Sequence, residues 1–168
     1  MSAKAFTSLL KRRAELRLGA RITAAGLFSF VLGEALTLPQ SYWAVFTAVL
    51  VVQTSVGGSF KAALDRLIGT VSGAVYGALV ATLVPHNDPL MLGTALLVSL
   101  APLAVLASFN ASFRVAPVTA VILLLGNTGA TEGPLLAALF RTIEVTLGGI
   151  VGLIVSLIVF PDRKSTRL

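Results

Sequence analysis

Six apolar stretches, separated by short polar or proline-containing turns, cover most of this chain of 168 residues. Four of them, at about 22–38, 67–84, 90–109 and 135–160, approach or exceed the ~20 residues that a helix needs to cross a lipid bilayer. The other two, 42–53 and 115–126, hold about 12 residues each and reach only ~18 Å as helices, because an α-helix rises ~1.5 Å per residue. The pattern predicts an all-α integral membrane protein with six transmembrane helices over 22–160.

The two ends of the chain differ from this apolar middle. Residues 1–21 mix arginines and lysines with leucines, which is typical of an amphipathic helix that lies in the membrane interface. A secretory signal peptide is the alternative, but the following apolar run contains Glu34 and lacks a small-residue cleavage site. Pro161 opens a short basic tail, 161–168. We expect both ends to flank the membrane domain.

Composition supports a lipid environment for most of the chain. Hydrophobic residues make up 56% and charged residues 12%, whereas a soluble domain has about 25% charged residues. The net charge of +6 does not suggest nucleic acid, because the basic residues sit between apolar runs rather than among exposed aromatics. With no cysteine, disulfides and thiolate metal sites are excluded. The expected partner is the lipid bilayer, and no cofactor or nucleic acid is expected.

The basic residues also indicate an orientation. With six spans, Arg141 alone falls on one side of the membrane, and the other side takes the remaining 12 of the 13 basic residues: Lys4, Lys11, Arg12, Arg13, Arg17, Arg21, Lys61, Arg66, Arg114, Arg163, Lys164 and Arg167. Short loops rich in Lys and Arg stay in the cytoplasm. The distribution predicts cytoplasmic N- and C-termini and a multi-pass protein of the bacterial inner membrane.

The second half of the chain repeats the first. Residues of the short span 42–53 recur 72 positions later: Ala44, Thr47, Ala48 and Val49 match Ala116, Thr119, Ala120 and Val121. Residues around the following long span recur 75 positions later: Arg66 matches Arg141, and Gly73 and Gly77 match Gly148 and Gly152. Each half, about 22–85 and 90–160, holds three spans, so the halves have opposite orientation. The pattern predicts a 3+3 inverted repeat, with a transport site between short spans in corresponding positions. Chance similarity of two Ala- and Gly-rich segments is the alternative.

Glycines recur every fourth residue in two of the long spans. Gly69, Gly73 and Gly77 lie on one face of the first, and Gly148 and Gly152 lie on one face of the second. Small residues at this spacing let helix backbones approach closely. We expect these faces to pack, either within the chain or between two copies.

Four charged residues fall inside or at the mouth of the apolar spans. A charge in the bilayer is costly and usually faces a cavity or a partner. Arg66 and Arg141 would attract an anion from opposite sides; alternatively Arg66 is an anchor at the cytoplasmic boundary and Arg141 pairs with Glu144, three residues on. Glu34 and Glu144 are candidates for proton coupling or for pairing with an arginine.

Polar side chains end both short spans. Gln53 and Thr54 lie at the end of the first, and Asn127 and Thr128 lie at the end of the second. Irregular backbone at membrane depth is tolerated where it is buried in protein or lines a watery cavity. These residues would line a polar substrate path or simply cap helices. Trp43 begins the first short span, where an interfacial aromatic belt is the usual role and stacking on an aromatic substrate is the alternative.

The same stretch of sequence suggests a family. Tyr42-Trp43-Ala44, Thr47, the break from Gln53 to Gly57, Arg66, Gly69-Thr70 and Gly73 resemble the signature of the fusaric acid resistance family. That family is related to the aromatic acid exporters and, more distantly, to plant aluminium-activated malate transporters. The resemblance is strongest over 42–77 and extends over about 20–161.

This resemblance implies a function. The implied structure is a six-span inverted-repeat bundle that pairs as a homodimer and exports small organic anions. In the malate transporters, pore arginines attract the anion, and the resemblance implies this role for Arg66 and Arg141. Many family members add a cytoplasmic helical domain or double the membrane unit; this chain shows neither, so we expect it to pair with another copy or to act as a minimal form.

Three hypotheses therefore stay open. The first is an exporter of organic anions, in particular aromatic carboxylic acids. The second is a passive organic-anion channel on the same scaffold, and the third is a membrane scaffold subunit without transport. An enzyme is not expected, because the sequence has no cluster with metal-ligand spacing, no phosphate-binding glycine loop and no nucleophile–base pair.

Overall fold

The computed structural model describes residues 3–85, 87–126 and 133–159, and for residues 3–14 the backbone alone. Within these ranges the chain is helical and contains no strand, which confirms the all-α prediction. In chain order the elements are α1 (Ala3–Ala35), α2 (Tyr42–Val51), α3 (Val56–Leu83), α4 (Pro89–Phe109), the 3₁₀ turn η1 (Ala111–Phe113), α5 (Ala116–Gly126) and α6 (Pro134–Ile158).

Four helices in the described part are long and apolar enough to cross a membrane. They are α1 over Glu15–Ala35, α3, α4 and α6. The other two, α2 and α5, have 10 and 11 residues, so both predicted short segments occur as short helices. Backbone groups in lipid must be satisfied within the segment, and a helix does this locally. The chain therefore has the helices of a multi-pass membrane protein.

The first helix covers both the basic segment and the apolar run that follows it. We expected an interfacial helix over 1–21 that leads into a span from residue 22, and α1 runs unbroken from Ala3 to Ala35. Nothing in the stretch stops a helix, since leucine, alanine and arginine all favour helix formation. Arg21 lies at the expected boundary and is buried. Its Nε donates a hydrogen bond to the carbonyl oxygen of Val159, 2.6 Å away, which ties α1 to the end of α6.

In the turn between α3 and α4, the local sequence sets where α4 begins. The side chain of Asp88 accepts a hydrogen bond from the backbone N–H of Met91 at 2.8 Å, and Pro89 occupies the first turn of α4. This is the expected capping arrangement, because the first N–H groups of a helix have no partner within the helix and proline lacks an N–H. The prediction of a helix start at this point is confirmed.

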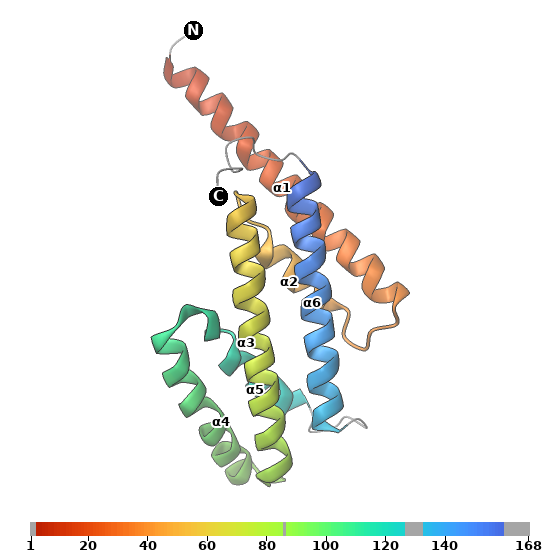
Figure 1. Ribbon diagram of the computed structural model, residues 1–168, viewed down its shortest axis with the longest axis vertical. Coiled ribbons are helices and arrows are strands. Elements are labelled where there is room, and N and C mark those ends of the chain that lie inside the picture. Colours follow the sequence, from red (N-terminus) through yellow and green to blue (C-terminus); the bar gives the residue numbers. More distant parts are fainter. Residues whose placement is uncertain (1–2, 86, 127–132, 160–168) are drawn as a thin grey trace.

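Two long antiparallel helices, α3 and α6, form the centre of the molecule (Figure 1). The short helix α2 packs on α6, and the short helix α5 packs on α3, so each half contributes a short helix to the long helix of the other half. A Cβ added to Gly73 would collide with the carbonyl oxygen of Ala116, and one added to Gly148 would collide with that of Ala44. The two crossings are thus at backbone contact and require glycine.

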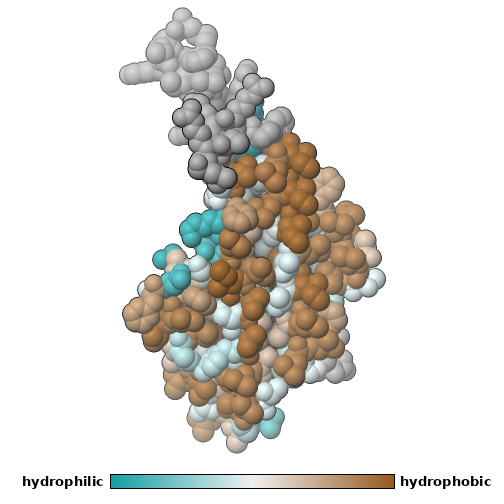
Figure 2. All heavy atoms as spheres, in the orientation of Figure 1, coloured by the Kyte–Doolittle hydropathy of each residue, from teal (hydrophilic) through white to brown (hydrophobic). Residues whose placement is uncertain are grey.

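Side-chain size decides which residues face inward. Ala44, Ala48, Ala116 and Ala120 are fully buried, whereas large apolar residues such as Phe109, 84% exposed, point outward. Figure 2 shows that apolar side chains cover most of the visible helical surface. A soluble monomer rarely exposes so much contiguous apolar surface. Small residues between helices and large ones outside are what a lipid environment favours, because lipid gives no hydrophobic drive to bury the large side chains.

Candidate functional site

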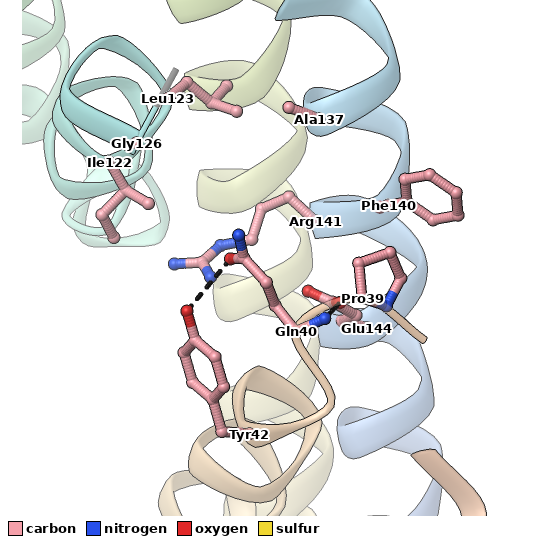
Figure 3. Close-up of a pocket in the computed structure, with 10 residues that line it drawn as sticks. All are labelled: Pro39, Gln40, Tyr42, Ile122, Leu123, Gly126, Ala137, Phe140, Arg141 and Glu144. Carbon is pink, nitrogen blue, oxygen red and sulfur yellow. Dashed lines mark hydrogen bonds between the residues drawn. The ribbon is translucent and has the colours of Figure 1, made fainter. Parts of the chain in front are cut away.

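A pocket of about 150 Å³ lies where the start of α2, the end of α5 and the first half of α6 meet. Both polar and apolar side chains line it. Its lining consists of Pro39, Gln40, Tyr42, Ile122, Leu123, Gly126, Ala137, Phe140, Arg141 and Glu144 (Figure 3). Two of the predicted site residues, Arg141 and Glu144, therefore share one pocket.

Arg141 is the central residue of this pocket. It extends from α6 and is only 5% exposed. In Figure 3 its guanidinium points away from α6 into the space between α2 and α5. Its Nε and Nη1 atoms are buried and have no hydrogen-bond partner, and no ion pair joins it to a carboxylate in the described part of the chain. Leaving a charged donor buried and unpaired costs free energy, so this group can gain from an incoming acceptor.

An aromatic ring, rather than an acceptor, holds Arg141 in place. The Cζ atom of Arg141 lies 3.1 Å from the centroid of the Trp43 ring. A guanidinium over a ring is attracted by the electrons of the ring face, and this contact uses none of its N–H groups. Trp43 therefore fixes the charge while its donors stay available.

Glu144 lies one turn further along α6 and is 1% exposed. Its Oε1 accepts a hydrogen bond from the backbone N–H of Gln40 at 2.8 Å. The side-chain Oε1 of Gln40 in turn accepts hydrogen bonds from Trp43 Nε1 at 2.9 Å and from the hydroxyl of Tyr42 at 3.2 Å. The segment before α2 is thus bound to both charged residues of the pocket, directly to Glu144 and through Trp43 to Arg141.

Arg66 approaches the same region from α3. Its Nε donates a hydrogen bond to Thr47 Oγ1 at 3.3 Å, and Thr47 is completely buried on α2. Arg66 lies close enough to Arg141 for the two positive charges to act on each other. It does not line the pocket. The structure therefore brings the two arginines of the repeat together but gives them different surroundings: one is bonded and one has free donors.

The other predicted site residues lie elsewhere. Glu34 is exposed at the end of α1, where its Oε1 accepts a hydrogen bond from Ser41 Oγ at 2.6 Å. Gln53 and Thr54 are exposed at the far end of α2; the backbone N–H of Gln53 donates to Ser59 Oγ at 2.9 Å. None of the three lines the pocket. Asn127 and Thr128 lie outside the described residues, directly after Gly126.

Gln40 and Tyr42 are site residues that the sequence alone did not identify, and for Trp43 the sequence offered substrate stacking rather than a contact with an arginine. Tyr42 and Trp43 begin a span, a position typical of an interfacial belt, and Gln40 reads as a turn residue. The one sequence feature that pointed to these three residues was their position at the start of a short apolar span. Nothing local links them to a charge 98 positions away, because that contact depends on how α2 crosses α6.

The electrostatics of the pocket favour an anion. Arg141 presents free donors, Arg66 adds a second positive charge nearby, and Gln40 and Tyr42 place the amino end of α2 at the rim. The N-terminus of a helix carries a partial positive charge that stabilises negative groups. Among the described residues of the lining, Glu144 alone carries a carboxylate.

Comparison with known proteins places the chain in a family. The model of the family described as fusaric acid resistance protein-like matches residues 25–155. The chain is also 30% identical over 157 residues to UPF0421 protein YgaE of Bacillus subtilis (strain 168), an alignment that covers 91% of this chain and 43% of that protein. The chain thus spans less than half the length of this curated relative. No solved structure matches it. This chain belongs to the fusaric acid resistance protein-like family.

Proposed function

We propose that this chain is the membrane unit of an exporter of small organic anions, above all aromatic carboxylates, in the bacterial inner membrane. The observation that carries the proposal is the pair of unpartnered, buried donors on Arg141 at the wall of a pocket. A carboxylate offers two acceptor oxygens in a plane, which matches the donor geometry of a guanidinium. An anion in this pocket would satisfy groups that the chain itself leaves unpaired.

The rest of the lining suits an organic rather than an inorganic anion. Ile122 and Leu123 give the pocket an apolar wall on the α5 side of the Arg141 guanidinium, and Phe140 is a further apolar lining residue from α6. Binding sites for small molecules combine such apolar walls with a few convergent polar groups that set the orientation. A carboxylate with a compact apolar body fills both parts.

We further propose that the bundle is a six-span, 3+3 inverted repeat with cytoplasmic termini. Corresponding residues make corresponding contacts: Gly73 meets Ala116, and Gly148 meets Ala44. Gly77 and Gly152 likewise meet Ala120 and Ala48. The two halves thus interlock through the same pair of surfaces. Transporters with inverted repeats change access by moving one repeat against the other around the bound substrate.

The family resemblance also favours a pair of chains as the working unit. The chain mass is 17.4 kDa. A light-scattering mass of about twice this value for the detergent-purified protein would support the homodimer, and a monomeric mass would count against it.

The decisive experiment measures uptake of labelled benzoate into proteoliposomes, with and without a pH gradient. We compare wild type with Arg141→Ala, Arg141→Lys and the control Arg114→Ala, which removes an exposed charge in the turn before α5. Wild-type and Arg114→Ala protein should transport, Arg141→Ala should lose at least tenfold in rate, and Arg141→Lys should recover little, because lysine lacks the planar fork of donors.

Two rival functions predict different results. A passive channel gives flux that needs Arg141 but ignores the pH gradient. A scaffold subunit gives no flux in well-folded wild-type protein with benzoate, malate or chloride. Equal rates for wild type and Arg141→Ala would refute the role of the pocket in any of these schemes.

A further inference from the structure

The contact between Arg141 and Trp43 is unusual in what it leaves free. A buried arginine commonly pairs with a carboxylate, which consumes its N–H donors. Here Glu144 is close by on the same helix, but its Oε1 is engaged by the backbone N–H of Gln40, and Arg141 keeps Nε and Nη1 without partners. The ring of Trp43 lies against the guanidinium, and the Glu144 carboxylate acts on Arg141 through its charge without a hydrogen bond.

Trp43 is itself held from several directions. Its Nε1 donates to Gln40 Oε1 at 2.9 Å. Its ring lies 5.2 Å from that of Tyr42 and 5.5 Å from that of Phe46, measured between centroids. A side chain fixed by a hydrogen bond and two ring contacts has little rotational freedom left. The plane against which the guanidinium rests is therefore set before any ligand arrives.

We propose that Trp43 is a positioning residue of the anion site: its ring holds the Arg141 guanidinium in place at the pocket wall, without using the N–H donors that an anion would engage, and Gln40 locks the ring. This inference rests on the proposed function, and it names a role that differs from stacking on the substrate. Donors that are already fixed bind an anion more tightly, because the entropy of ordering the arginine side chain is not lost on binding.

The transport test uses Trp43→Leu, Trp43→Phe and the control Phe109→Leu. Phe109 lies at the end of α4, is 84% exposed and does not line the pocket, so its loss removes a ring without touching Trp43 or Arg141. The substrates are labelled benzoate and butyrate, one with a ring and one without. Trp43→Leu should raise KM about tenfold for both anions, Trp43→Phe should raise it less, and Phe109→Leu should leave it unchanged.

A second measurement needs no transport and no Trp43 variant. Trp43 is the only tryptophan of the chain, so intrinsic tryptophan emission reports this one ring. Butyrate, which does not absorb in this range, should shift the emission of purified wild-type protein in a saturable way. In Arg141→Ala protein the emission of the free state should differ, and the response to butyrate should vanish.

Several results would overturn the inference. A rise in KM for benzoate alone would mean that the ring contacts the substrate instead of positioning the arginine. Unchanged KM in Trp43→Leu, or no emission response in wild-type protein that transports butyrate, would show that the ring is not needed. These outcomes leave Arg141-dependent transport intact, so they are distinct from failure of the proposed function, in which Arg141→Ala transports like wild type.

Discussion

At the scale of single residues, the pocket holds two buried charges of opposite sign that are not bonded to each other. Arg141 rests on Trp43, and Glu144 accepts a hydrogen bond from Gln40. Their spacing on one helix face would allow a pair, which is one of the two roles that the sequence leaves open for Glu144. The geometry keeps the second role open as well, because a carboxylate beside the anion site can take up a proton in step with transport.

Glu144→Gln tests that coupling role. Glutamine keeps the size of the side chain and still offers an oxygen to the N–H of Gln40, but it carries no titratable proton. We expect benzoate flux that no longer follows the pH gradient in the proteoliposome assay. Glu34→Gln is the matched control, since Glu34 is exposed and bonded to Ser41 outside the pocket. Gradient-driven flux in Glu144→Gln would remove this residue from the coupling mechanism.

At the scale of helices, two glycine–alanine crossings set the distance between short and long helices. In each, the glycine of a long helix lies against the backbone of a short helix: Gly73 against Ala116 and Gly148 against Ala44. The crossing of α2 over α6 also brings Trp43 to Arg141. Packing and site geometry are therefore coupled through the same contact.

Gly148→Ala should destabilise the bundle by about 1–3 kcal/mol, because a well-packed contact cannot absorb an added methyl group without a shift. Gly93→Ala is the control: it changes the same residue type inside α4, where an added Cβ meets nothing within 4 Å, and alanine favours the helix. Thermal unfolding in detergent, followed by circular dichroism, measures both. A midpoint for Gly148→Ala at or above that of Gly93→Ala would contradict the close approach of α2 and α6.

At the scale of the whole molecule, the orientation of the bundle in the membrane is the main prediction. The chain has no cysteine, so single-cysteine variants report one position each. An impermeant thiol reagent applied to intact cells should label Leu36→Cys and Asn87→Cys from outside. Gly57→Cys and Ala111→Cys should react only after permeabilisation. Outside labelling of either of the last two would contradict six spans with cytoplasmic termini.

Much of the fold follows from local sequence. Helix positions, the short lengths of α2 and α5 and the cap at Asp88 were all predictable, because helical hydrogen bonds and caps involve residues close in the chain. The pattern left open whether the basic segment and the first span form one helix, since the transition from basic to apolar residues changes the surroundings of a helix without breaking its hydrogen bonds.

By itself the sequence determined that this protein is a helical membrane protein of the fusaric acid resistance protein-like family, with Arg141 and Glu144 as candidate site residues. Apolar runs of sufficient length predict membrane-spanning helices, because a helix satisfies its own backbone hydrogen bonds in lipid. The residues of 42–77 indicate the family. The tertiary structure decided that Trp43 supports Arg141, that Gln40 occupies Glu144 and that Gln53 and Thr54 lie away from the pocket. The physical reason is that these relations depend on the rotation and crossing of helices distant in sequence, which small residues at the contacts set and which no local pattern encodes.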